Sequence, residues 1–256
     1  MKALAALALP AALILVLLGG WEAACRLLAV PSYILPPPSE IAQAVIAGRA
    51  ILFASAWNTL AMALAALVVA AAIATPLALL TGLSPVIERA VSPLAVTLQV
   101  TPVVAIAPLV VIWAGLEHPE RAIVALAAVV AFFPIFSGAL SGLKSADPDL
   151  ERLFDLYGAT RLQRLLRLRA PAATPFYMEG IKVAAGLSII GAVVAEFVAG
   201  SGGAQGLAWR ILEAGNRLRI AEMFAAVFAL AVLGAGLYAA MQAVERKVLA
   251  AWRGRD

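Results

Sequence analysis

The chain has 256 residues, of which 64% are hydrophobic and only 13% are charged, and its mean hydropathy is +0.98. Soluble domains carry roughly 25% charged residues, so this composition predicts an integral membrane protein and argues against an ordinary soluble enzyme. The single cysteine, Cys25, excludes an intramolecular disulfide, and with only one histidine, His118, the chain offers no cluster of metal ligands. We therefore expect no metal site and no cofactor on this chain.

A membrane-spanning helix needs about 20 apolar residues, and the chain has room for six such segments in a single all-α transmembrane domain over residues 1–256. The predicted spans cover residues 3–30, 54–81, 91–115, 122–143, 176–199 and 223–244. The first apolar run is longer than the core of a signal peptide, and no small-residue cleavage site follows it, so we interpret it as a retained span. After it, Ser39 is predicted to cap a short helix that reaches Ala47.

The longest polar interval, residues 147–171, lies between the fourth and fifth predicted spans. Asp147 is suited to cap a helix whose first position is Pro148. Apolar residues spaced by three or four positions predict that this helix has one apolar face: Leu150, Leu153, Phe154 and Tyr157. Gly158 is predicted to end the helix, because glycine readily adopts the left-handed conformation found at helix ends.

A second helix is predicted to begin directly after Gly158. Thr160 and Gln163 match a capping box at its start, and Pro171 is predicted to stop it. This helix carries leucines on one side and arginines on another: Leu162, Leu165 and Leu166, and Arg161, Arg164 and Arg167. On pattern alone, one interpretation of the stretch is a basic helix that lies on anionic lipid headgroups.

The fifth predicted span carries small residues at a spacing of four, followed by a glutamate: Gly180, Ala184, Ser188, Ala192 and Glu196. Small residues at that spacing favour close helix packing. The alternative is a surface that lines a pathway, with Glu196 at its outer mouth. In the third span, Gln99 and Thr101 favour hydrogen bonds between helices, with contact to a solute as the alternative. No span shows an obvious buried acid–base pair, which weakens a proton-driven mechanism.

Residues 200–206 read GSGGAQG, which shares its glycines with phosphate-binding loops. The segment lacks the Gly-Lys-Ser/Thr ending of such loops and follows no soluble strand, so we interpret it as a flexible outer loop. No other segment supplies a nucleotide site. The chain is therefore not expected to be an enzyme, and any ATP that drives it must be hydrolysed by a partner chain.

The polar interval resembles a loop found in permease subunits of bacterial ABC importers. That cytoplasmic loop reads Glu-Ala-Ala, three residues, Gly, nine residues, and Ile-x-Leu-Pro. Gly158 and Pro171 keep the spacing, and leucine and alanine stand at the Ile and Leu places. The chain departs from the pattern at the triplet, where it has Arg152–Phe154 and a glutamate, Glu151, one position early.

Two further segments, Leu35–Ile41 and Ala107–Gly115, resemble the sulfonate, taurine and nitrate permease group of type I, binding-protein-dependent importers. A glutamate followed by a glycine-rich loop and Gly-Leu is also common in that group, and Glu196, Gly206 and Leu207 match it. The resemblance implies a permease that moves a small solute by alternating access. Sulfonates, taurine, nitrate, a thiamine-precursor pyrimidine or riboflavin are the solutes of similar permeases.

The resemblance further implies that residues 147–171 form a coupling helix pair that docks on an ATPase subunit. The implied assembly is a homodimer with two ATPase copies and a periplasmic or extracytoplasmic solute-binding protein. The expected ATPase-coupling residues are Asp149, Glu151, Leu153, Phe154, Tyr157, Gly158, Ala159, Thr160, Arg161, Arg164 and Pro171. The expected path residues are Gln99, Thr101, Ser188 and Glu196. The alternative is a stand-alone secondary transporter or channel.

The distribution of basic residues predicts the orientation of the chain in the membrane. With residues 147–171 in the cytoplasm, twelve lysines and arginines fall on the cytoplasmic side and six on the outer side. Six spans then place both termini in the cytoplasm, and the resemblance implies that the membrane is a bacterial inner membrane. The net charge of +4 therefore reflects topology, so we expect membrane lipid rather than nucleic acid around the chain.

Overall fold

The computed structural model describes residues 2–115, 117–199 and 205–253, and for residues 2–8, 10, 11 and 253 it describes the backbone only. Every secondary-structure element in these ranges is a helix, which confirms the all-α prediction. Contacts divide the chain into two compact units, residues 1–57 with 205–231 and residues 58–204 with 232–256. The predicted loop at 200–206 lies mostly outside the described residues.

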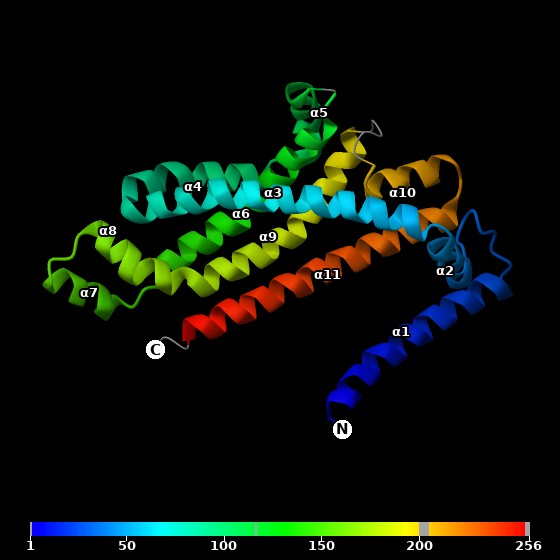
Figure 1. The fold of residues 1–256 in the computed structure, drawn as a ribbon, viewed down its shortest axis with the longest axis horizontal. Helices are drawn as coiled ribbons and strands as arrows, with labels where there is room; N and C mark the ends of the chain where they lie inside the picture. Colours follow the sequence, from blue (N-terminus) through cyan, green and yellow to red (C-terminus); the bar gives the residue numbers. More distant parts are fainter. Residues whose placement is uncertain (1, 116, 200–204, 254–256) are drawn as a thin grey trace. The chain divides into compact units, whose positions relative to one another are not determined.

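The first unit contains α1 (Lys2–Leu27), α2 (Pro38–Ala47), α10 (Leu207–Asn216) and the first parts of α3 (Arg49–Leu83) and α11 (Ile220–Arg253) (Figure 1). Glu22 joins α1 to α2, because its carboxylate accepts hydrogen bonds from the Ser39 amide at 3.0 Å and the Ser39 hydroxyl at 2.9 Å.

The cap of α2 differs from the prediction. Pro37 is the N-cap and Pro38 the first helical residue, so Ser39 lies inside the first turn. Proline suits the first helical position because it has no N–H that needs a partner there. The Ser39 amide is one of the helix's unsatisfied first-turn donors, and the distant carboxylate of Glu22 satisfies it in place of a local cap.

In the second unit, α6 (Pro119–Leu143) and α9 (Ala170–Ala199) pack along one another (Figure 1). Their backbones approach closely, since a Cβ atom added at Gly180 would lie 2.6 Å from the carbonyl oxygen of Pro134. Ala184, Ser188 and Ala192 in the predicted stripe are completely buried. The structure therefore shows close helix packing at the small residues of this stripe, and the alternative, a surface that lines a pathway, stays a prediction.

The predicted third span is not one helix. It is divided into α4 (Pro85–Val100) and α5 (Val103–Ala114), which meet at a bend of 98° (Figure 1). Pro102 disfavours helical backbone at the preceding residue, and Thr101 accordingly adopts an extended conformation with ψ of 125°. The Thr101 hydroxyl donates to the carbonyl of Thr97 at 2.7 Å, so the helix end before the bend is satisfied locally.

Within the described residues, four helical segments are long and apolar enough to cross a membrane: Arg49–Leu83, Pro119–Leu143, Arg161–Ala199 and Ile220–Trp252. The bent pair α4–α5 is a fifth candidate. The predicted first span falls on α1, where part of the side chains lie outside the described residues, so six spans stay a prediction. The observed helices also extend beyond the predicted spans; α3, for instance, begins at Arg49 rather than near residue 54.

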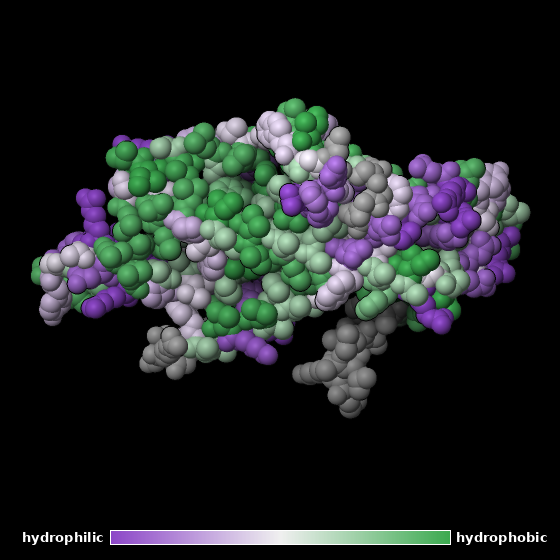
Figure 2. Space-filling model, turned by 45° about the horizontal axis from the view of Figure 1, so that its top comes forward, coloured by the Kyte–Doolittle hydropathy of each residue, from purple (hydrophilic) through white to green (hydrophobic). Residues whose placement is uncertain are grey.

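Hydrophobic side chains cover broad areas of the molecular surface visible in Figure 2. Exposed apolar residues occur on several of the long helices, among them Val68, Ile73, Val232 and Val244. A soluble monomer rarely exposes such continuous apolar surface. Lipid or another subunit must therefore cover these helices.

Candidate functional site

The polar interval folds into two short helical segments with an elbow between them. The first, α7 (Pro148–Leu156), begins as predicted: Asp147 is the N-cap and accepts a hydrogen bond from the Asp149 amide at 2.8 Å, with Pro148 next. Most of its apolar side chains are exposed: Leu150 and Leu153 are each 44% exposed, Leu156 is 84% exposed and the C-cap Tyr157 is 83% exposed, whereas Phe154 is half-buried. An amphipathic helix whose apolar face is not buried in its own fold is suited to contact another molecule.

Gly158 forms the elbow, as predicted. Its φ of +66° lies in the left-handed region, which glycine adopts without penalty. The Gly158 amide donates to the Asp155 carbonyl and the Ala159 amide to the Phe154 carbonyl, both at 3.0 Å. These two hydrogen bonds form a Schellman motif, which satisfies the last carbonyls of α7 and reverses the direction of the chain.

The second segment starts with the predicted capping box. In α8 (Arg161–Arg164), the Gln163 amide donates to the Thr160 hydroxyl at 3.2 Å, and the Thr160 amide donates to the Gln163 side chain at 2.9 Å. The reciprocal pair satisfies two amides that a helix start otherwise leaves open. The local sequence thus determines both the end of α7 and the start of α8.

The prediction that Pro171 stops this second helix is wrong. A π turn, Leu165–Arg169, follows α8 and leads directly into α9, so one helical segment runs from Arg161 to Ala199. The Ala170 amide donates a hydrogen bond to the carbonyl of Leu165, five residues earlier, whereas in an α-helix the acceptor lies four residues earlier. Wider turns of this kind re-satisfy backbone groups around a proline in membrane helices. The coupling segment and the fifth span are therefore continuous.

Ion pairs connect the two sides of the elbow. Glu151 on α7, whose side chain is 20% exposed, accepts a hydrogen bond from Arg169 Nε at 2.5 Å and lies 3.5 Å from Arg164 Nε. Arg164 also pairs with Asp155. Arg169 Nη1 donates to the carbonyl of Gly82 in the last turn of α3 at 3.2 Å. Sequence reasoning missed these contacts, because the partners lie in separate elements.

Eight of the eleven predicted coupling residues divide into two sets; of the other three, Phe154 and Ala159 are half-buried and Gly158 forms the elbow. Glu151 and Arg164 are paired inside the chain, whereas the side chains of Asp149, Leu153, Tyr157, Thr160, Arg161 and Pro171 are exposed. A cavity of about 300 Å³ lies in the bend of the elbow. It is lined by Leu153, Phe154, Tyr157, Ala159, Gln163 and Arg167. The elbow thus presents a hollow that combines apolar side chains with the polar groups of Gln163 and Arg167.

The four predicted path residues occupy different environments. Gln99 is exposed near the end of α4, and Thr101 is at the bend before α5. Ser188 is completely buried against α6 and donates to the Ala185 carbonyl in its own helix at 2.8 Å. Glu196 is 4% exposed on α9. A common pathway for these side chains stays a prediction.

A largely buried ion pair joins two long helices in the second unit, and the sequence reading missed it. Lys182 Nζ on α9 lies 2.9 Å from a carboxylate oxygen of Glu245 on α11, with side-chain exposures of 11% and 15%. Lys182 also pairs with Glu179. Each charge looks isolated within its own span, because its partner is far away in the sequence.

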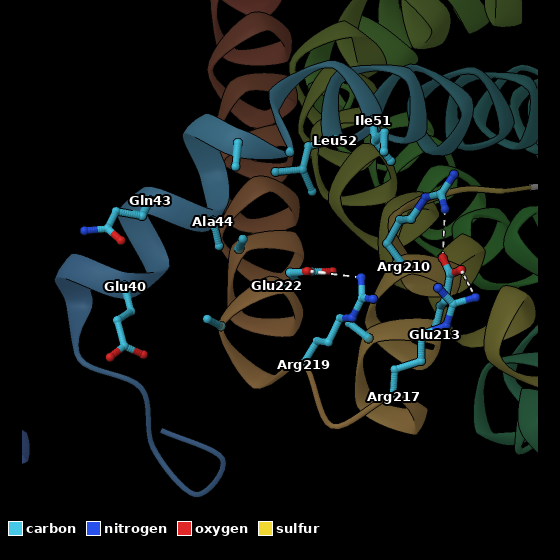
Figure 3. A pocket seen from close by; sticks show the side chains of 15 residues that line it. Glu40, Gln43, Ala44, Ile51, Leu52, Arg210, Glu213, Arg217, Arg219 and Glu222 are labelled. Carbon is cyan, nitrogen blue, oxygen red and sulfur yellow. Dashed lines mark hydrogen bonds and ion pairs between the residues drawn. The ribbon is translucent and has the colours of Figure 1, made fainter. Parts of the chain in front are cut away.

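The first unit holds a separate cavity of about 600 Å³ between α2, α10 and the first turns of α3 and α11 (Figure 3). Figure 3 shows Glu213 between Arg210 and Arg217, whose guanidinium nitrogens lie 2.8 and 3.1 Å from its carboxylate. Arg219 and Glu222 form a further pair at 3.4 Å. The Arg210 side chain is also anchored by donating to the buried hydroxyl of Ser55 at 3.0 Å.

Long apolar helices, broad exposed apolar surface and an amphipathic helix pair between two of the long helices define a multi-span membrane protein. No group of three or more histidine, cysteine or acidic side chains gathers in the described ranges to hold a metal.

Comparison with known proteins identifies the family. Residues 74–250 match the family model described as the binding-protein-dependent transport system inner membrane component, and the chain belongs to this family. It is 33% identical to the formylaminopyrimidine transport permease protein ThiX of Halalkalibacterium halodurans. The similarity extends over 248 residues, which are 96% of this chain and 96% of the relative. It is 33% identical to the riboflavin transport system permease protein RibX of Chloroflexus aurantiacus, over 96% of this chain and 90% of the relative.

The taurine transport system permease protein TauC of Escherichia coli is 28% identical, over 93% of this chain and 87% of the relative. These findings confirm the resemblance to type I importer permeases. The chain is a permease subunit of an ABC importer, and the stand-alone secondary transporter is set aside. The family is one of multi-pass inner membrane transport permeases.

Proposed function

We propose that this chain forms the translocation path of an ATP-driven importer as a homodimer, with six spans per protomer and both termini in the cytoplasm. The observation that carries the proposal is the exposed apolar face of α7, next to a capped and sharply turned elbow. Two copies of an ATPase subunit dock there. Binding and hydrolysis of ATP then switch the spans between inward-open and outward-open states by alternating access.

The ATPase contact consists of the exposed set of coupling residues and the cavity in the elbow. Leucine and tyrosine side chains supply apolar area, and Arg167 supplies positive charge in the lining of the cavity. This combination suits a partner surface with an apolar projection beside a carboxylate. The predicted path residues, Gln99, Thr101, Ser188 and Glu196, belong to the proposed route of the solute.

The charged cavity in the first unit supports docking of a periplasmic or extracytoplasmic solute-binding protein. In the proposed orientation, α2 and α10 face outward, as do Arg217 and Arg219, which are both more than half exposed. Alternating positive and negative side chains around a cavity favour a charged, complementary loop over an apolar one. The solute belongs to the range named for the relatives: a formylaminopyrimidine, riboflavin, taurine or an aliphatic sulfonate.

Purification tests the proposal directly. The tagged chain, extracted gently from its native membrane, is expected to retain one ATPase subunit per permease, measured by mass spectrometry. Tyr157→Ser removes an 83% exposed aromatic side chain from the elbow and is expected to reduce ATPase recovery at least fivefold.

Tyr33→Ser is the matched control, because Tyr33 is also exposed, at 67%, but follows α1 on the proposed outer side. It is expected to retain the ATPase fully. Equal recovery with both variants would remove the elbow from the interface. Absence of any ATPase subunit from the unaltered chain would contradict the docking proposal as a whole.

A further inference from the structure

Glu151 differs from its neighbours on α7 because its side chain is turned into the protein. Arg152 and Asp149, on either side of it, have side chains that are 79% and 84% exposed, whereas the Glu151 side chain is 20% exposed. Its carboxylate is placed between two arginines of the following helical segment, with Arg169 Nε at 2.5 Å and Arg164 Nε at 3.5 Å. Such a group is poorly placed to reach a partner protein.

Arg169 continues this connection to a third element. While Nε holds Glu151, Nη1 donates to the Gly82 carbonyl at 3.2 Å. Gly82 lies in the last turn of α3, where carbonyls lack partners within the helix and carry the negative end of its dipole. A guanidinium can serve both acceptors because its donors form a rigid, planar fork, which a lysine ammonium lacks.

The surrounding packing holds these groups in place. Leu143, Leu165 and Ala173 form a buried apolar cluster, against which Leu79 and Leu83 of α3 pack. A Cβ atom added at Gly82 would lie only 3.0 Å from a Leu143 methyl group. The ends of α3 and α6 thus lie directly against the π turn that carries Arg169. Ion pairs beside such a cluster are screened less by solvent than pairs on an open surface.

We propose that Glu151 is a positioning residue that transmits movement of α7, through Arg169, to the end of α3 as well as to α9. The inference rests on the proposed function in one respect: an ATPase subunit must be what moves α7. It assigns Glu151 a role inside the permease rather than in the ATPase contact. One docking event then acts on two spans at once, through a salt bridge and a hydrogen bond that share one arginine.

Spin-label distances in the purified full-length permease test the connection without any ATPase. With Cys25→Ser as background, labels at Arg152→Cys on α7 and Arg89→Cys on α4, shortly after α3, report how firmly α7 is held. Glu151→Gln is expected to broaden the distance distribution at least twofold. Arg169→Lys keeps the positive charge but cannot serve both acceptors, so it is expected to broaden the distribution similarly.

Glu179→Gln is the matched control, since it removes an exposed carboxylate that pairs with Lys182 in α9, away from the elbow. It is expected to leave the distribution unchanged. A wild-type width in Glu151→Gln would overturn the proposal. A wild-type width in Arg169→Lys would overturn the link to α3, because charge alone would then be sufficient.

The complex with the ATPase supplies the functional readout. A non-hydrolysable ATP analogue is expected to shift the distance between the Arg89→Cys labels of the two protomers. Glu151→Gln is expected to reduce that shift to less than about half of its wild-type size. Recovery of the ATPase with Glu151→Gln is expected to stay at the wild-type level. Loss of ATPase recovery without broadening would show that Glu151 contacts the ATPase, and would overturn the inference. A wild-type chain that retains no ATPase would contradict the proposed function alone, since the label widths are measured on the permease by itself.

Discussion

Gly158 shows how one residue sets the geometry of the coupling loop. Its φ is +66°, and no atom lies within 4 Å of the position that a Cβ would occupy, so space does not limit substitution there. Backbone conformation does limit it, because a β-branched residue in the left-handed region is strained by roughly 1–2 kcal/mol. The residue matters through its conformation rather than through its contacts.

Gly158→Val is therefore expected to open the elbow and to reduce ATPase recovery with the purified permease several-fold. Gly158→Asn is the control, because asparagine tolerates the left-handed region, and it is expected to remain close to wild type. If both variants retain the ATPase equally well, the Schellman turn does not determine how α7 is presented.

At the scale of single helices, the contact between α6 and α9 depends on glycine, which has no side chain to hold the two backbones apart. The backbones of the two helices lie so close that a Cβ at Gly180 would be 2.6 Å from the Pro134 carbonyl oxygen. Elsewhere on the same helix, Gly186 has no atom within 4 Å of its Cβ position. Two glycines in α9 thus have different surroundings. The spacing of glycines in the sequence does not show which of them is packed against another helix.

Gly180→Ala is expected to force α6 and α9 apart and to destabilise the folded permease by about 1–3 kcal/mol, the usual cost of overpacking. Gly186→Ala is expected to be neutral or slightly stabilising, because alanine favours helix over glycine. Thermal unfolding of the two variants in the same detergent measures the difference. Equal melting temperatures would contradict the close contact at Gly180.

The continuity of α8, the π turn and α9 is a second property at this scale. The elbow is joined to the fifth span by a single helical segment, Arg161–Ala199, rather than by a non-helical joint. The π turn also brings Arg169 to the end of α3. The polar interval is therefore an extension of the membrane helices, and Glu151, Arg164 and Arg169 are among the side chains that join α7 to them.

For the whole molecule, the proposed orientation assigns the elbow and the charged cavity of the first unit to opposite sides of the membrane. Positive charge is concentrated on the side that includes Arg152 and Arg161, as the positive-inside rule requires of a cytoplasmic face. Arg217, in contrast, lines the cavity near α10. The lone native cysteine, Cys25, is buried, which gives a low labelling background.

Membrane-impermeant maleimide applied to intact spheroplasts, with Cys25→Ser as background, is expected to label Arg217→Cys and not Arg152→Cys. Both side chains are well exposed, at 59% and 79%, so accessibility in the folded chain does not separate them. Permeabilised cells are expected to label both variants equally. The reverse pattern in spheroplasts would invert the proposed topology.

Local chemistry explains why parts of this structure are predictable from the sequence. The helix start at Asp147, the elbow at Gly158 and the capping box at Thr160 each depend on backbone groups only a few residues away. Composition likewise determines that the chain is helical and lies in a membrane. The bend at Pro102 also has a local cause, because the residue before a proline avoids helical backbone. The sequence prediction missed the bend because the apolar residues continue on both sides of it.

Only the tertiary structure decided the features that depend on partners distant in the sequence. Nothing near Pro171 shows that a π turn carries the helix past it, and nothing near Glu151 indicates that the side chain turns inward to Arg169. The pairing of Lys182 with Glu245 likewise joins two separate spans. The length of each apolar run predicts which residues form the long helices. The partner of a buried charge depends instead on how those helices pack, because a charge removed from water is stable only beside its counter-charge.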